Sequence, residues 1–201
     1  MENNKFTEIV VIIDKSGSMY DLQDDVIGGY NSFIEEQKKL GPAKVTIVTF
    51  NHEVNIVAEE EDINTVQRLN KKNYSPSGCT ALLDAVGDSI ALIKAKHAKL
   101  KAEELPEHTI FSIVTDGLEN SSREYTYPRI KQMIDLQTKC GWNFIFQAAN
   151  IDVAQEASRL GIHRDMCFSF AADPEGIRNQ TRFLAKKVSC IRDGGGKKAK
   201  K

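Results

Sequence analysis

The stretch "VVIIDKSGSM", residues 10–19, runs branched apolar side chains directly into Asp14 and then spaces two serines around a glycine. Uninterrupted apolar runs of this length are typical of strands that are buried on both faces, as in parallel sheets. A second run, "FSIVTDG" at residues 111–117, ends in the same way at Asp116. We therefore expect both aspartates at the carboxyl ends of buried parallel strands.

Outward from these two runs, apolar segments alternate with amphipathic helical patterns. Strands are predicted at residues 8–14, 44–50, 51–57, 108–116, 142–150 and 165–170, and helices at 22–40, 81–104, 126–139, 152–160 and 173–191. Strands joined by crossover helices are parallel, whereas the third strand follows a tight turn and therefore pairs antiparallel at an edge. The predicted fold class is α/β: a doubly wound, Rossmann-like, mostly parallel six-stranded sheet in the order 3-2-1-4-5-6, with one antiparallel edge strand and helices on both faces.

Length and composition limit the possible functions. The chain of 201 residues is long enough for one domain, predicted at residues 1–193, with a flexible basic tail at 194–201. The net charge of −1 provides no overall attraction to nucleic acid or an anionic membrane. No segment approaches the roughly 20 apolar residues of a membrane helix, and the N-terminus lacks a secretory-signal pattern, so a cytoplasmic location is expected. Four scattered cysteines predict reduced, mostly buried thiols.

Five oxygen-bearing side chains are expected to converge at one edge of this sheet. In a sheet of the predicted order the first and fourth strands are neighbours, and ligands bind beyond their carboxyl ends, where the strand order reverses. Asp14 and Asp116 meet there, Ser16 and Ser18 follow in the first loop, and the loop that carries Thr80 leads into the same crevice. Mg²⁺ prefers about six oxygen ligands, so the sequence predicts a site for Mg²⁺, with Mn²⁺ and Ca²⁺ as alternatives.

Other roles for these residues are weaker. Ser16 and Ser18 could cap a helix, and Thr80 is expected at the N-cap of the helix at 81–104. A nucleophilic serine is not favoured, because the G-x-S-x-G pattern is absent, and no phosphate-binding loop occurs. Phosphatases of the haloacid dehalogenase class require a second acid where Ser16 stands. Glu119 is the one nearby candidate for a general base, and its loop position favours solvation; no enzymatic activity is expected.

The segments "DKSGS", "SGCT" and "TDG" together resemble the metal-ion-dependent adhesion site of von Willebrand factor type A domains. The resemblance covers nearly the whole chain and implies that Asp14, Ser16, Ser18, Thr80 and Asp116 bind a divalent cation, usually Mg²⁺. It also implies that an Asp or Glu of a partner protein completes the metal's coordination shell. The segments "TDGLENSSREYT" and "FIFQAANID" are similar to those of small stand-alone bacterial and phage members.

The sequence therefore predicts a metal-dependent protein-binding module without specific nucleic-acid or membrane contacts; it leaves the oligomeric state open and favours a monomer. Exposed aromatic and apolar side chains often anchor interfaces. The candidates for the contact rim around the metal are Met19, Tyr20, Tyr74, Leu118 and Tyr125, and a core position is the alternative for any of them. Two other hypotheses stay open: a metal-dependent hydrolase acting on a phosphoryl or acyl substrate, and a scaffold in which the metal is purely structural.

Overall fold

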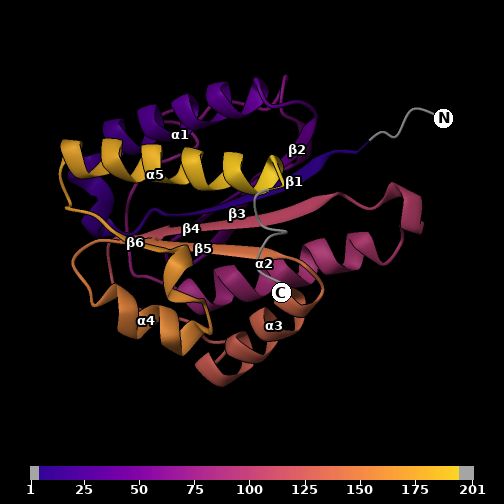
Figure 1. The fold of residues 1–201 in the computed structure, drawn as a ribbon. Coiled ribbons are helices and arrows are strands. Elements are labelled where there is room, and N and C mark those ends of the chain that lie inside the picture. Colours follow the sequence, from indigo (N-terminus) through magenta and orange to yellow (C-terminus); the bar gives the residue numbers. More distant parts are fainter. Residues whose placement is uncertain (1–4, 195–201) are drawn as a thin grey trace.

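The structure, a computed structural model, describes residues 5–194 and consists of a six-stranded sheet between two layers of helices (Figure 1). The strands are β1 (Thr7–Asp14), β2 (Ala43–Phe50), β3 (Val54–Asp62), β4 (His108–Thr115), β5 (Asn143–Ala148) and β6 (Cys167–Ser169). Their order is β3-β2-β1-β4-β5-β6; β2 and β3 are antiparallel, and the other neighbours are parallel. The predicted α/β, Rossmann-like fold class is confirmed. Most of the predicted tail, residues 195–201, lies outside the described residues.

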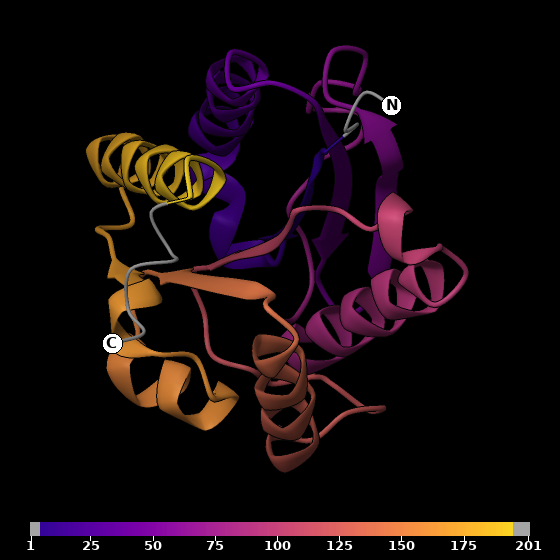
Figure 2. The ribbon, with the colours of Figure 1, turned by 45° about the vertical axis from the view of Figure 1, so that its right-hand side comes forward.

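Helices cover both faces of the sheet (Figure 2). One face carries α1 (Gln23–Lys38) and α5 (Pro174–Arg192), and the other carries α2 (Leu82–His97), α3 (Tyr127–Lys139) and α4 (Val153–Leu160). Three short 3-10 helices, η1 (Gly17–Leu22), η2 (Ala102–Glu104) and η3 (Arg164–Met166), lie in the connections. Within residues 5–194, every helix is too short or too polar to cross a bilayer.

The central strand β1 is buried along its full length, which explains its uninterrupted apolar sequence. Ile9 and Ile13 belong to the core beneath α1 and α5, whereas Val10 and Ile12 belong to the core on the α2 and α3 side. Burying each such side chain contributes roughly 1.5–3 kcal/mol. Two-sided packing therefore fixes the position of Asp14, the last residue of the strand.

A glycine lets α1 and α5 pack closely. A Cβ at Gly29 would lie 2.5 Å from Thr181 Oγ1 and 3.4 Å from Ile177 Cγ2, both on α5. The adjacent Gly28 has open space instead, with no atom of residues 5–194 within 4 Å of the equivalent position. Only Gly29 of this pair is therefore required by the helix packing.

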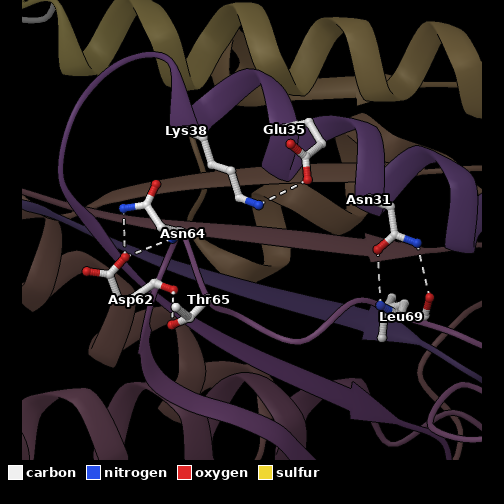
Figure 3. A network of polar contacts seen from close by, with 7 residues as sticks. All are labelled: Asn31, Glu35, Lys38, Asp62, Asn64, Thr65 and Leu69. Carbon is white, nitrogen blue, oxygen red and sulfur yellow. Dashed lines mark hydrogen bonds and ion pairs between the residues drawn. The ribbon is translucent and has the colours of Figure 1, made fainter.

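A long connection of residues 63–81 runs from the edge strand β3 to α2 and ends at the predicted metal loop. Figure 3 shows how it is attached to α1: Asn31 Nδ2 donates to the Leu69 carbonyl at 3.0 Å, and Leu69 N–H donates back to Asn31 Oδ1 at 3.1 Å. At its start, the Asp62 carboxylate accepts a hydrogen bond from Asn64 N–H. The two bonds between Asn31 and Leu69 tie this irregular segment to α1 before it reaches Thr80.

Several predicted boundaries and burials are wrong. The tight turn expected before the third strand occupies residues 51–53, so β3 begins at Val54 and not at 51. It extends through the acidic residues to Asp62, which pairs with Lys44 of β2, and Glu59 and Glu60 form ion pairs with Lys96 of α2. The long helix predicted at 81–104 ends at His97, and the one predicted from 22 begins at 23 after η1. The cysteines are free thiols, but three of the four are exposed rather than buried, namely Cys79, Cys140 and Cys190.

Candidate metal centre

Asp14 is held in one orientation at the end of β1, and its side chain is fully buried. Its Oδ1 accepts a hydrogen bond from Ser16 N–H at 2.7 Å, and its Oδ2 accepts one from Thr115 Oγ1 at 2.6 Å. The Asp14 carbonyl accepts a third bond from the Tyr74 hydroxyl, also at 2.7 Å. The carboxylate is therefore held by the loop after β1 and by β4, and the main chain of Asp14 is held by the long connection.

Asp116 follows the neighbouring strand β4 and is almost fully buried, so the two predicted carboxylates lie at the ends of adjacent strands. Ser18 Oγ donates to Asp116 Oδ1 at 2.6 Å, and Ser18 Oγ shares a hydrogen bond of 3.1 Å with Ser16 Oγ. A continuous set of hydrogen bonds thus connects Asp14, Ser16, Ser18 and Asp116. The expected convergence of these four residues is present in the structure; their role as metal ligands stays a prediction.

Burial makes the negative charge of both carboxylates costly. Desolvation, with a smaller contribution from the charge of Asp116, raises the pKa of Asp14 to about 6 against the opposing hydrogen bonds from Thr115 and Ser16. Desolvation likewise raises the pKa of Asp116, and the hydrogen bond from Ser18 opposes that shift. A nearby cation would stabilise both ionised forms, since an opposite charge at short range favours them.

The serines do not act as ordinary helix caps. Ser16 precedes η1, yet its hydroxyl faces Ser18 and caps no N–H of that helix within the described residues. Ser18 lies inside η1, where its hydroxyl faces Asp116. Both hydroxyls are consequently directed to the aspartates and not to the start of a helix.

Thr80 is buried beside the same cluster. A Cβ added to Gly117 would lie 3.5 Å from Thr80 Oγ1 and 4.0 Å from Ser18 Oγ, so the absent side chain of Gly117 leaves room for two hydroxyls beside Asp116. The prediction that Thr80 is the N-cap of α2 is wrong. The N-cap is Ala81, and Thr80 lies one residue earlier.

Glu119 caps α2 from a different segment, so the expectation that it is solvated is wrong. Its Oε2 accepts from Leu83 N–H at 3.0 Å and from the Ser122 hydroxyl at 2.7 Å. Its Oε1 accepts from the N–H groups of Ser121 and Ser122. Both carboxylate oxygens of the one candidate base are thus occupied by structural hydrogen bonds.

The predicted contact rim divides into exposed and buried side chains. Tyr20 is 69% exposed and Leu118 is 55% exposed, and each lies two residues after a predicted ligand. Tyr125 is half-buried against Gly87, where a Cβ would lie 2.6 Å from its ring. Met19 and Tyr74 are fully buried in the core, so for these two candidates the alternative of a core position is correct.

Sequence reasoning missed three contacts with the predicted ligands: those of Thr115 and Asn120, which it did not name, and that of Tyr74, which it placed at the contact rim instead. Thr115 directly precedes Asp116, so its place at the strand end could have been noticed. Asn120 Oδ1 accepts from Thr80 N–H at 2.9 Å across 40 residues, and the Tyr74 hydroxyl reaches Asp14 across 60. No local pattern reveals either of these long-range contacts.

The residues present fit a divalent cation that prefers oxygen. The donor set comprises two carboxylates and three hydroxyls, and Gly117 leaves space beside them. Hard cations such as Mg²⁺ and Ca²⁺ bind carboxylate, hydroxyl and water oxygens. Across residues 5–194 there is no cluster of three or more His, Cys, Asp or Glu that could form another kind of metal site.

Comparisons with known proteins bear on the fold. No family model and no curated protein matches the sequence. Among solved structures, the von Willebrand factor domain of the type V pili tip protein Mfa5 from Porphyromonas gingivalis has a TM-score of 0.66 at 10% identity, covering 90% of this chain and 94% of that one. A von Willebrand factor type A structure from Catenulispora acidiphila has a TM-score of 0.61 at 14% identity, covering 92% of this chain and 43% of that one.

A third neighbour holds a metal. Proximal thread matrix protein 1 from the mussel byssus, with a zinc-occupied metal-ion-dependent adhesion site, has a TM-score of 0.65 at 14% identity. The match covers 93% of this chain and 46% of that one, so this chain spans less than half of the mussel protein. Identities this low show likeness of fold alone. The fold of this chain is similar to that of von Willebrand factor type A domains.

Proposed function

We propose that this chain is a divalent-cation-dependent protein-binding module of the von Willebrand factor type A group. Asp14, Ser16, Ser18, Thr80 and Asp116 hold Mg²⁺ at a metal-ion-dependent adhesion site, and an Asp or Glu of a partner protein completes the coordination shell. The observation that carries this proposal is the hydrogen bond from Ser18 to Asp116, which joins the DKSGS loop to the end of the neighbouring strand. The zinc-occupied site of the mussel neighbour supports it.

The charge of the site favours an acidic ligand. Two carboxylates balance a divalent cation, and the hydroxyls add no negative charge, so a bound cation keeps attraction for a further carboxylate. Tyr20 and Leu118 are two of six large apolar side chains that are exposed among residues 5–194. We propose that they contact the residues flanking the partner's acid, because exposed aromatic and apolar groups commonly anchor interfaces.

We further propose that the module has no enzymatic activity. Metal-assisted hydrolysis requires a bound water to be activated, commonly with the help of a base or a second cation. Glu119 is the nearest candidate base, and four hydrogen bonds already occupy its carboxylate. The monomeric state and the cytoplasmic location expected from the sequence stay predictions.

The decisive experiment is isothermal titration of the metal-stripped full chain with Mg²⁺ and Mn²⁺. Asp116→Asn keeps the shape of the side chain and removes one charge, and it should weaken binding strongly. Asp21→Asn is the matched control, because this exposed aspartate lies in η1 near the site but outside the predicted ligand set. Equal binding heats in the wild type and both variants would contradict the metal site.

Two further measurements separate the remaining hypotheses. Turnover of phosphoryl or acyl esters by the wild type that disappears in Asp116→Asn would favour the metal-dependent hydrolase. The structural scaffold would be favoured by two results together: chelation lowers the melting temperature strongly, and binding to partner proteins does not itself require the metal. The adhesion module predicts no turnover, and it predicts that binding to an immobilised acidic partner is lost on addition of EDTA while the fold persists.

A further inference from the structure

The segment that carries Thr80 is hydrogen-bonded to the loop that begins at Asp116. Asn120 contacts Thr80 twice: its N–H donates to the Thr80 carbonyl at 3.0 Å, and its Oδ1 accepts from Thr80 N–H at 2.9 Å. Ser121 N–H donates to the same carbonyl at 3.2 Å. Both main-chain polar groups of Thr80 are therefore bound by this one loop.

Glu119 makes a second connection, between the same loop and the first turn of α2. Helix α2 begins after Ala81, which has no side chain able to cap it, so the first N–H groups of the helix need an outside acceptor. Glu119 Oε2 accepts from Leu83 N–H, and a carboxylate in this place also interacts favourably with the helix dipole. The remaining bonds of Glu119, from the N–H groups of Ser121 and Ser122 and from the Ser122 hydroxyl, fold its own loop around the carboxylate.

Asp84 completes this attachment from the helix side. Its carboxylate accepts hydrogen bonds from the N–H groups of Arg123, Glu124 and Tyr125 at 2.8 to 3.0 Å, and its own N–H donates to Ser122 Oγ. The loop after Asp116 and the start of α2 are thus joined from Thr80 to Asp84. These hydrogen bonds hold the segment that carries Thr80 against the loop that follows Asp116.

We propose that Glu119 and Asn120 are positioning residues of the metal centre, which hold the Thr80 hydroxyl at a fixed place relative to Asp116. This inference rests on the proposed function and extends it to two residues outside the five-residue motif. Neither side chain needs to contact the cation. Groups that orient metal ligands in this way typically change metal affinity by roughly 10–100-fold when they are replaced.

The test is Mn²⁺ and Mg²⁺ titration of the full chain carrying Asn120→Ala or Glu119→Gln. Each variant should weaken metal binding by about tenfold or more. Asn120→Asp keeps the oxygen that accepts from Thr80 N–H, so this variant should bind the metal at least as tightly as the wild type. Ser121→Ala is the matched control: Ser121 Oγ is buried in the same loop and has no hydrogen-bond partner among the described residues, so its removal should leave the Kd unchanged.

A second readout separates positioning from general stability. The melting temperature of each variant is measured in EDTA, where a merely structural role would lower it without changing the Kd of the folded protein. Wild-type metal binding that is lost in Asp116→Asn but unchanged in Asn120→Ala and Glu119→Gln would overturn the positioning role and leave the proposed function intact. A wild type that binds neither cation at millimolar concentration would overturn both.

Discussion

Thr115 Oγ1 donates a hydrogen bond of 2.6 Å to Asp14 Oδ2, and this bond links the ends of two central strands across 101 residues of sequence. Both side chains are fully buried, so water cannot replace the donor if it is lost. We predict that Thr115→Val lowers the free energy of unfolding by about 1–3 kcal/mol, the usual cost of leaving a buried polar group without its partner. Urea denaturation of the metal-free protein measures this loss.

Thr115→Ser is the control for this prediction, because it keeps the hydroxyl and removes only a methyl group. Its loss of stability should be clearly smaller than that of Thr115→Val. Equal losses in the two variants would mean that side-chain packing at the end of β4, and not the hydrogen bond to Asp14, determines stability there.

The Tyr74 hydroxyl ties the long connection to the last carbonyl of β1. Tyr74→Phe removes this bond and keeps the buried ring, so we expect a loss of about 0.5–1.5 kcal/mol in the free energy of unfolding. Tyr20→Phe provides the comparison, since Tyr20 is exposed and its hydroxyl can be hydrated in the folded protein. A loss in Tyr20→Phe as large as that in Tyr74→Phe would contradict the assigned role.

Glu8 lies near the start of β1, at the opposite end from Asp14, and its burial predicts that the stability of the protein depends on pH. Burial raises its pKa from an ordinary value of 4.5 to about 8; Glu60 adds to the shift, and Lys44 and Lys96 oppose it. Its Oε2 has no hydrogen-bond partner among the described residues, and its Oε1 has only a long contact of 3.5 Å with Thr46 Oγ1.

The direction of this effect follows from proton linkage. Between pH 4.5 and about 8 the unfolded chain releases the Glu8 proton while the folded protein retains it, so stability falls as the pH rises. The limiting slope is about 1.4 kcal/mol per pH unit. Glu8→Gln should flatten the curve of unfolding free energy against pH in this window, and Glu53→Gln, at an exposed position, should not. Parallel curves for the wild type and Glu8→Gln would contradict the prediction.

The side chains at the ends of the strands could be predicted from the sequence because their positions depend on a local pattern. Buried strands of parallel sheets have continuous apolar runs, and the residue at which each run stops is visible, so Asp14 and Asp116 could be placed together from the sheet order alone. The spacing of Ser16 and Ser18 then placed two hydroxyls beside them, and the structure has both in contact with the cluster.

Contacts between distant loops could not be predicted in the same way. Thr80 looked like an N-cap because threonine before a helical pattern usually is one, but Glu119 supplies the cap from 36 residues away. The burial of Met19 beside the exposed Tyr20 depends on how η1 turns above the core, which no periodicity in a six-residue 3-10 helix reveals. Packing between segments, and not local propensity, decides these positions.

The neighbouring glycines of α1 predict two substitutions of opposite effect. Gly28→Ala meets open space within the described residues and removes the entropic cost of glycine in a helix, so it should raise the free energy of unfolding by roughly 0.5–1 kcal/mol. Gly29→Ala places a Cβ 2.5 Å from Thr181 Oγ1, which forces α1 and α5 apart or Thr181 into another rotamer and should cost about 1–3 kcal/mol. Thermal and urea unfolding of the two single variants measure the gain expected for Gly28→Ala and the loss expected for Gly29→Ala. Gly29→Ala combined with Thr181→Ala, which removes Oγ1, tests the contact itself. Stabilisation by both single substitutions would show that α5 moves away from α1 without cost, and the close packing of the two helices at Gly29 would then contribute nothing to stability.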